Sequence, residues 1–174
     1  MKRHLALVGF MAAGKSTIGK RLARRLSCAF YDIDDLVVRD HGAISDIFYN
    51  EGEGAFRRYE KAALADVLEN GEAGVVALGG GALTLEENQK LLKKRAYRIF
   101  VKVSPEQALE RMRRSKMVRP LLGPTPSLNK IRELYTKRMP QYAHADYVVE
   151  VDETTTSQAV DDIIAWLHKK KIHF

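Results

Sequence analysis

The fold is decided by the stretch Gly9-Phe10-Met11-Ala12-Ala13-Gly14-Lys15-Ser16, which has the spacing G-x-x-x-x-G-K-S of a phosphate-binding loop. The apolar run His4–Val8 precedes it and the amphipathic run Lys15–Leu26 follows it, so the motif joins an expected buried strand to an expected helix. Glycines allow successive backbone N–H groups and the helix N-terminus to point at phosphate oxygens. The sequence therefore predicts a loop that binds the phosphates of ATP.

Side chains of this loop add contacts to those of the backbone. Lys15 places a positive charge at the β- and γ-phosphates, where it would act in catalysis, and the hydroxyl of Ser16 can bind Mg²⁺. The residues that we expect to contact the nucleotide are Ala12, Ala13, Gly14, Lys15, Ser16 and Thr17.

Outward from the loop, short apolar runs alternate with longer amphipathic ones. Strands are expected at His4–Val8, Ala29–Asp32 and residues 75–78, 99–103 and 147–151. Helices are expected at Lys15–Leu26 and residues 36–40, 44–49, 56–68, 84–92, 128–138 and 158–169, with Thr84 as an N-cap. Alternating strands and helices imply a parallel sheet covered by helices on both faces. We therefore expect a three-layer α/β/α fold in a single kinase domain that spans residues 1–174.

Composition narrows the class of protein. With 174 residues, 45% of them apolar and 29% charged, the chain can bury a sizeable core. Its one cysteine, Cys28, excludes a disulfide framework, and the N-terminal apolar run is too short for a signal peptide or a membrane span. The cytoplasm is therefore expected, with no membrane partner. The net charge of +7 fits nucleic acid, an anionic small molecule such as ATP, or simply a solvated basic surface. The basic residues are dispersed and have no interleaved aromatics, so no stacking platform for bases is indicated and no nucleic-acid partner is expected.

Aspartates follow the second expected strand, in the run Asp32-Ile33-Asp34-Asp35. The strand expected at residues 75–78 ends in glycines and offers no carboxylate for a metal. Because the carboxyl ends of parallel strands line the ligand crevice, the aspartates can face the phosphate loop. We predict that Asp32 holds Mg²⁺ through a bound water, that Asp34 accepts a hydrogen bond from the acceptor hydroxyl, and that Asp35 caps the next helix.

A glycine triplet and two arginines are further candidates for the acceptor site. Gly79, Gly80 and Gly81 would let the backbone approach a small ring closely. The planar guanidinium groups of Arg57 and Arg138 suit a carboxylate better than lysine would. The residues alone leave ordinary roles open, namely a solvated helix face for Arg57 and a helix C-terminal cation for Arg138.

Together these motifs resemble the shikimate kinase family. The shared features occur in the family's order over residues 5–152: the phosphate loop, Asp32-x-Asp34, Phe56-Arg57-Arg58, Gly79-Gly80-Gly81, Arg119-Pro120-Leu121 and Arg138-x-Pro140-x-Tyr142. The resemblance implies the fold of the nucleoside monophosphate kinases, with a five-stranded parallel sheet. It also implies ATP-dependent phosphorylation of the 3-hydroxyl of shikimate, a step towards chorismate and the aromatic amino acids. Separately, we expect the protein to act as a monomer.

The same resemblance implies roles for individual residues. Shikimate would contact Asp34, Arg57, Gly79, Gly80, Gly81 and Arg138, with residues 33–60 as the substrate-binding region. Arg119 would lie on a mobile lid at about residues 113–126, contact the phosphates, and act in catalysis with Lys15 and Asp34. Arg111 is the expected adenine contact. The chain departs from the family at Ala12, where a glycine is common, and in a segment before the lid that is about one residue longer than usual.

Other nucleotide-binding functions are the alternatives. Another small P-loop kinase, acting on gluconate or on a nucleoside monophosphate, would use the same loop, although the glycine triplet together with Asp32-x-Asp34 favours shikimate. A GTPase switch would carry N-K-x-D and D-x-x-G. The run Asn129-Lys130-Ile131-Arg132 lacks the aspartate, and D-x-x-G does not occur. An ATPase that translocates on nucleic acid would usually need a longer chain.

Overall fold

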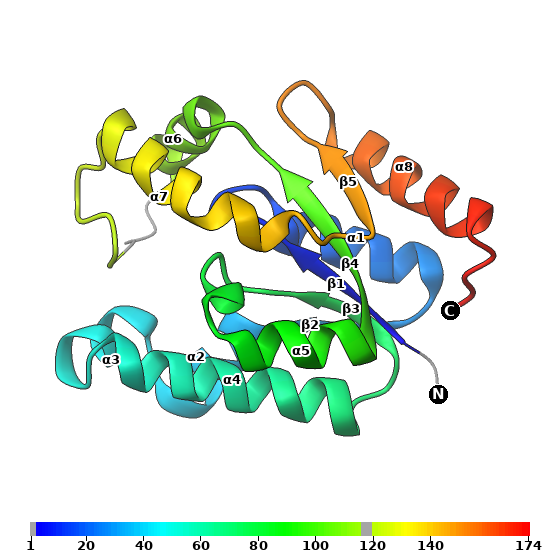
Figure 1. The fold of residues 1–174 in the computed structure, drawn as a ribbon, viewed down its shortest axis with the longest axis horizontal. Helices are drawn as coiled ribbons and strands as arrows, with labels where there is room; N and C mark the ends of the chain where they lie inside the picture. The colour runs from blue at the N-terminus through cyan, green and yellow to red at the C-terminus, as the bar shows by residue number, and fades with distance from the viewer. Residues whose placement is uncertain (1–2, 116–119) are drawn as a thin grey trace.

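A computed structural model describes residues 3–115 and 120–174 of the chain (Figure 1). Its described strands form one parallel sheet in the order β2-β3-β1-β4-β5. Their bounds are His4–Val8 for β1, Ala29–Asp32 for β2, Gly74–Ala77 for β3, Ala96–Lys102 for β4 and Tyr147–Glu150 for β5. The five-stranded parallel sheet expected from the family resemblance is thus confirmed within the described residues.

Helices connect the strands and cover both faces of the sheet. They are α1 (Lys15–Leu26), α2 (Ile33–His41), α3 (Ile44–Asn50), α4 (Glu53–Asn70), α5 (Glu86–Arg95), α6 (Pro105–Arg114), α7 (Leu128–Tyr142) and α8 (Thr156–Lys169), with a 3₁₀ turn η1 at Ala82–Thr84. Figure 1 shows α4 and α5 along one side of the sheet and α8 along the other. None of the helices in the described part of the chain is long and apolar enough to cross a membrane.

The central strand β1 shows why the fold has three layers. Its side chains alternate between the two faces, as in any strand. Leu5 and Leu7 pack in a core cluster with α1 and α8, whereas Ala6 and Val8 pack in a second cluster with α4 and α5. All four side chains are buried. A strand whose residues 5–8 are all apolar therefore requires cover on both faces, which confirms the α/β/α prediction.

A smaller cluster holds α2, α3 and α4 together beside the main sheet. Its buried members are Val37, Ile47, Ala55 and Phe56, one or more from each of these helices. This helical unit follows β2 in the chain and lies next to the carboxyl ends of the strands. Its packing fixes the helices on which several of the predicted acceptor-site residues lie.

One predicted helix cap is wrong. Thr84 does not cap α5, which begins at Glu86 after Leu85 and has no side-chain cap. Thr84 ends the 3₁₀ turn, and its hydroxyl donates a 2.7 Å hydrogen bond to the carbonyl oxygen of Gly81. The hydroxyl is therefore engaged in the turn that follows the glycine triplet, and it is this turn that sets where α5 starts.

Candidate active site

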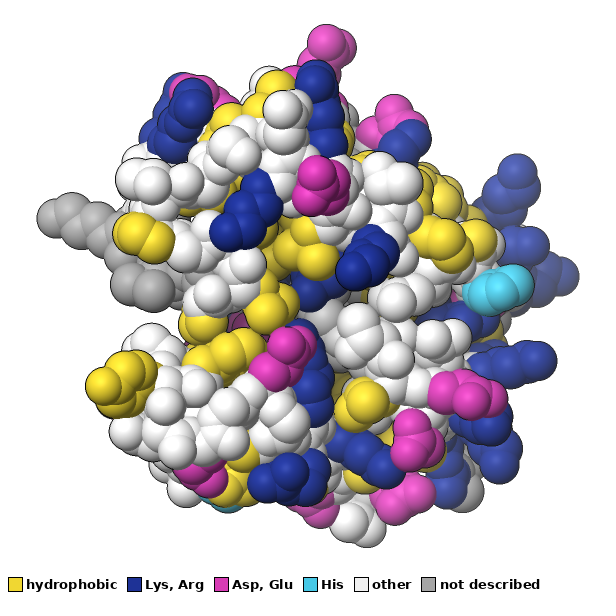
Figure 2. Space-filling model, turned by 60° about the vertical axis from the view of Figure 1, so that its left-hand side comes forward, with side chains coloured by type: hydrophobic (Ala, Val, Ile, Leu, Met, Phe, Trp, Pro, Cys, Tyr) yellow, Lys and Arg dark blue, Asp and Glu magenta, His cyan; other side chains and the backbone are white. Residues whose placement is uncertain are grey.

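A cavity of about 560 Å³ opens at the carboxyl ends of the central strands. The phosphate loop forms one wall, the glycine triplet after β3 forms the floor, and α2, α3, α4 and α7 contribute side chains. Figure 2 shows a hollow on this face with hydrophobic side chains along its rim. The strand order places the loops after β1 and β3 side by side, and for this reason motifs that lie far apart in the sequence meet here.

Lys15 forms hydrogen bonds with the backbone of its own phosphate loop. The Nζ atom of Lys15 donates hydrogen bonds of 2.8 Å to the carbonyl oxygens of both Gly9 and Phe10. Gly14, the residue before α1, has φ 92°, a left-handed conformation that a glycine adopts without steric cost. The lysine ammonium is thereby held at the centre of a loop whose N–H groups can receive phosphate, as the motif predicts.

Asp32 joins the phosphate loop to helix α2. One carboxylate oxygen, Oδ1, accepts hydrogen bonds from the backbone N–H groups of Asp34 (3.1 Å) and Asp35 (3.3 Å), so Asp32 is the N-cap of α2. The prediction that Asp35 caps this helix is wrong, because the carboxylate one position before the first turn reaches the free N–H groups. The other oxygen, Oδ2, accepts a hydrogen bond from the hydroxyl of Ser16.

The Ser16–Asp32 pair is the part of the site that could hold Mg²⁺. It supplies a hydroxyl and a carboxylate, which are hard oxygen ligands of the kind that Mg²⁺ binds. Within the described residues there is no cluster of three or more His, Cys, Asp or Glu side chains able to hold a metal. One hydroxyl and one carboxylate side by side fit Mg²⁺, which usually keeps several waters and binds phosphate oxygens beside one or two carboxylates.

The first glycine of the triplet lies against two carboxylates. A Cβ atom on Gly79 would lie 2.6 Å from Oε1 of Glu60 and 2.9 Å from Oδ1 of Asp34. Real Cβ atoms essentially never show contacts this short, so a side chain here would displace the two acids. Asp34 thus faces the cavity from the first turn of α2, as predicted.

The second and third glycines lie against the two arginines. A Cβ atom on Gly80 would lie 3.3 Å from Nη1 of Arg138, and one on Gly81 would lie 2.8 Å from Cζ of Arg57. The triplet therefore leaves room for charged side chains that pack directly on the backbone. The structure brings together all the acceptor-site residues that the sequence singled out, from the loop after β3 and from α2, α4 and α7.

Glu60 belongs to this cluster although sequence reasoning did not include it. Its side chain is 0% exposed, and its Oε2 accepts a 2.7 Å hydrogen bond from Nη1 of Arg57. Burial raises the pKa of Glu60, and the charge of Arg57 opposes the shift. Sequence signals existed: Glu60 follows Arg57 at i+3 and continues the inward-facing series Phe56, Glu60, Leu64, where an apolar residue is expected.

Arg138 is buried rather than a cation at a helix end. Its side chain is 4% exposed, and its Nη1 has no hydrogen-bond partner among the described residues. Burial lowers the pKa of this guanidinium. Beside it, the hydroxyl of Tyr142 donates a 3.0 Å hydrogen bond to the carbonyl oxygen of Gly80, and burial raises the pKa of Tyr142 to about 12. An unpaired N–H on a buried cation is costly, and an anionic ligand would satisfy it.

Arg111 contacts the phosphate loop at a smaller cavity, separate from the cavity that holds Arg57 and Arg138. Its Nη1 donates hydrogen bonds to the carbonyl oxygens of Ala12 (3.3 Å) and Ala13 (3.2 Å), and its Nη2 donates one of 2.7 Å to that of Val151. Ala12 has φ 60°, the left-handed region that favours the glycine common in the family. The smaller cavity, of about 130 Å³, is also lined by Thr17 and residues 154–156.

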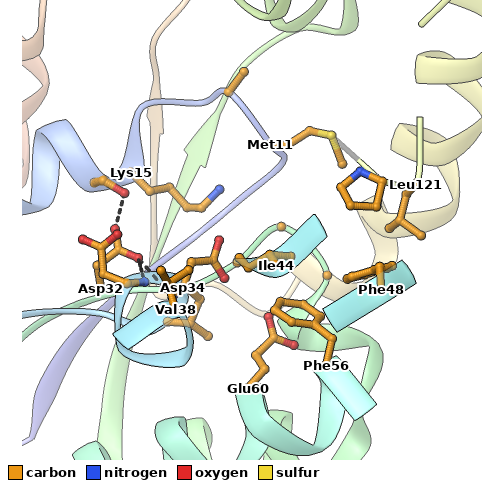
Figure 3. Close-up of a pocket in the computed structure, with 18 of the residues that line it drawn as sticks. Met11, Lys15, Asp32, Asp34, Val38, Ile44, Phe48, Phe56, Glu60 and Leu121 are labelled. Carbon is orange, nitrogen blue, oxygen red and sulfur yellow. Dashed lines mark hydrogen bonds between the residues drawn. The ribbon is translucent and has the colours of Figure 1, made fainter. Parts of the chain in front are cut away.

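Apolar side chains flank the polar floor of the larger cavity. In Figure 3, Met11 and Leu121 lie on one side and Phe48 and Phe56 on the other, and all four line the cavity. Arg119, which was predicted to contact the phosphates from the lid, lies outside the described residues.

A phosphate loop of this kind, on this sheet order, defines a nucleotide-binding protein of the P-loop class with the fold of the nucleoside monophosphate kinases. Sequence comparison identifies the particular group within the class. Residues 11–168 match the family model described as shikimate kinase, so the chain belongs to the shikimate kinase family. The family resemblance drawn from the motifs is confirmed.

Individual relatives agree with this assignment. The chain is 41% identical to a shikimate kinase of Nitrobacter winogradskyi over 97% of its own length and 78% of the relative's. It is 40% identical to one of Thermus thermophilus, with 94% and 90% of the two chains covered. The structure superposes with a TM-score of 0.91 on a shikimate kinase from Acinetobacter baumannii in complex with shikimate, at 34% identity over 99% of this chain and 96% of the other.

Proposed function

We propose that this protein transfers the γ-phosphoryl group of ATP to the 3-hydroxyl of shikimate and releases ADP and shikimate 3-phosphate. The reaction is a step towards chorismate and the aromatic amino acids. One observation carries the choice of acceptor: two arginines and two carboxylates converge on a glycine triplet beside the phosphate loop. Membership of the family and the shikimate complex of the Acinetobacter relative support the same acceptor.

The acceptor would be held by complementary chemistry at each part of the cluster. Its carboxylate would pair with Arg57 and Arg138, whose guanidinium groups can each donate two parallel hydrogen bonds. Its hydroxyls would bond to Asp34 and to the backbone of the glycine triplet. The apolar side chains on the two flanks of the cavity would contact the faces of the ring.

The transfer itself would depend on position and charge. Asp34 would orient the acceptor hydroxyl and accept its proton late in the transfer, while the hydroxyl oxygen attacks the γ-phosphorus and the bond to the ADP oxygen breaks. Lys15 and Arg119 would stabilise the charge on the transferring group. Ser16 would hold Mg²⁺ directly and Asp32 through a water. The ion, when bound, neutralises charge on the β- and γ-phosphates.

The remaining contacts follow from the position of each segment. Arg111, at the smaller cavity beside the loop after β5, would contact the adenine. Residues 33–60 would form the substrate-binding region, and residues 113–126 a lid that excludes water from ATP. We expect the chain to act as a single-domain monomer in the cytoplasm, without a nucleic-acid or membrane partner. Sedimentation at working concentration would test the monomer.

Acceptor-dependent release of ADP tests the proposed reaction. Purified protein with Mg²⁺ and ATP should release ADP when shikimate is added. Quinate and gluconate, which are also polyhydroxy carboxylates, serve as controls and should stimulate far less. Equal stimulation by gluconate would favour the alternative kinase. Absence of stimulation by shikimate would contradict the acceptor while leaving the phosphate loop as an ATP site.

A further inference from the structure

Arg57 lies between two glutamates of its own helix, and they hold it differently. Glu60 accepts a 2.7 Å hydrogen bond from Nη1, and its side chain is 0% exposed. Glu53 approaches the other edge of the guanidinium, where its Oε1 accepts from Nε at 3.4 Å and from Nη2 at 3.3 Å, and its side chain is 50% exposed. Glu60 is therefore a fixed partner, whereas Glu53 is free to swing into water.

Glu53 occupies one of the two edges on which a guanidinium binds a carboxylate with two parallel hydrogen bonds. Glu60 takes the Nη1 side from within the protein, so the Nε–Nη2 edge remains for a ligand. A carboxylate binds a guanidinium best with two oxygens in two parallel hydrogen bonds. Glu53 offers one oxygen to both N–H groups, at distances longer than those of a charge-assisted pair. A ligand carboxylate can therefore make a better contact than Glu53 does.

The balance of charge points the same way. Among the described side chains that meet here, two are cationic (Arg57 and Arg138) and three are acidic (Asp34, Glu53 and Glu60). Glu60 is committed to its ion pair with Arg57, and the charge of Glu53 also acts on Arg138. Glu53 thus neutralises both arginines that an anionic acceptor would use. When Glu53 moves away from Arg57, the repulsion between its carboxylate and the carboxylate of the acceptor is removed.

We propose that Glu53 is an exchangeable counter-ion that keeps the Nε–Nη2 edge of Arg57 in place until the carboxylate of the acceptor displaces it. Glu53 is a positioning residue, since it acts through Arg57. The exchange makes the site selective, because only an acceptor with a carboxylate can replace the interaction that is lost. This inference rests on the proposed function, in which the acceptor is a carboxylate bound by Arg57.

The test compares Glu53→Gln with Glu51→Gln. Glu51 lies two residues earlier, is exposed, and accepts a hydrogen bond from Tyr59 rather than from Arg57, so its replacement removes the same charge without touching the pair. We expect Glu53→Gln to lower KM for shikimate about 2- to 5-fold, the range of an exposed ion pair. Its kcat and its KM for ATP should stay within about twofold of wild type. Glu51→Gln should change KM for shikimate much less than Glu53→Gln does, because Glu51 does not contact Arg57.

A neutral acceptor analogue gives a second readout. The methyl ester of shikimate cannot form the bidentate pair, so its inhibition constant should be the same in wild type and Glu53→Gln. Glu53→Ala should shift KM for shikimate in the same direction as Glu53→Gln, and it serves if the glutamine variant fails to fold.

Three results would overturn the inference. An increase in KM for shikimate in Glu53→Gln would mean that Glu53 supports Arg57 in the complex and is not displaced. Equal changes in KM for shikimate in Glu53→Gln and Glu51→Gln would mean that Glu53 acts only through the net charge of this region and not through its contact with Arg57. An equal decrease in the inhibition constant of the methyl ester would show that the effect of Glu53 does not depend on the carboxylate of the acceptor. Failure of the proposed function is separate, since wild-type protein would then show no shikimate-dependent release of ADP.

Discussion

The nucleotide side and the acceptor side of this cavity are built in different ways. The phosphate loop is a continuous segment between β1 and α1, and its groups are mostly backbone atoms ordered by Gly14 and Lys15. The acceptor side gathers charged side chains from α2, α4 and α7 around the loop after β3. A continuous motif depends on local conformation, whereas a gathered site depends on the packing of the whole domain.

Lys15→Met should produce the largest change and should affect the nucleotide side. Loss of the ammonium that neutralises the transferring phosphoryl group is expected to lower kcat about 100- to 1000-fold. Shikimate binding measured by calorimetry without nucleotide should stay within about twofold of wild type. Lys20→Met, on the exposed face of the same helix, is the matched control. A comparable loss of shikimate binding in Lys15→Met would break the separation of the two sides.

Asp34→Asn should have the next largest effect and should act through the acceptor. The amide keeps the shape of the side chain but cannot take the proton of the hydroxyl, so kcat should fall about 100-fold. ADP binding, measured by calorimetry, should be unchanged. Asp35→Asn is the control. It changes the neighbouring carboxylate but keeps the backbone N–H of Asp35 that donates to Asp32, and the variant should retain most of the activity. A near-normal kcat in Asp34→Asn would remove Asp34 from catalysis.

His4, at the end of the sheet away from the cavity, should affect neither the nucleotide side nor the acceptor side. His4 begins β1, is buried, and has its pKa lowered by burial and then by the charge of Arg95. Because the folded state disfavours the protonated ring, the stability from neutral His4 is fully present above the unfolded pKa of about 6.5 and is lost as pH falls below it.

Thermal denaturation at pH 7.5 and pH 5.5 checks this expectation. The midpoint of wild type should fall by a few degrees more than that of His4→Gln over this interval. The KM values of the variant for ATP and shikimate should equal those of wild type at pH 7.5. An identical pH dependence in the two proteins would show that His4 titrates normally in the fold.

The sequence allowed much of the fold and the nucleotide side to be predicted because the relevant signals are local. The apolar strand β1, the glycines and Lys15 act within about a dozen positions, and the structure places them as expected. Prediction was less accurate where neighbouring carboxylates compete for one role. Asp32 both caps α2 and contacts Ser16, which the pattern of three nearby aspartates could not reveal.

Contacts between distant segments explain what the sequence left open on the acceptor side. The orientation of Arg138 depends on how α7 packs near the glycine triplet, and the role of Glu60 depends on its burial beneath Arg57. The motif order of the family supplied these arginines as candidates, but a helical arginine has by itself no signal that separates a buried residue from a solvated one. Glu60 had such a signal, an acid at an inward-facing position of α4.

Calorimetric titration of Gly81→Ala with shikimate and with ADP tests the two-sided account most directly. Gly81 has φ −108°, which alanine adopts without strain, so the substitution adds only a methyl group, and its Cβ would lie 2.8 Å from Cζ of Arg57. The account predicts that shikimate binding weakens at least about 10-fold, because the guanidinium must move from the acceptor site, while ADP binding changes less than about twofold. Unchanged shikimate binding, or equal loss of both ligands, would contradict it.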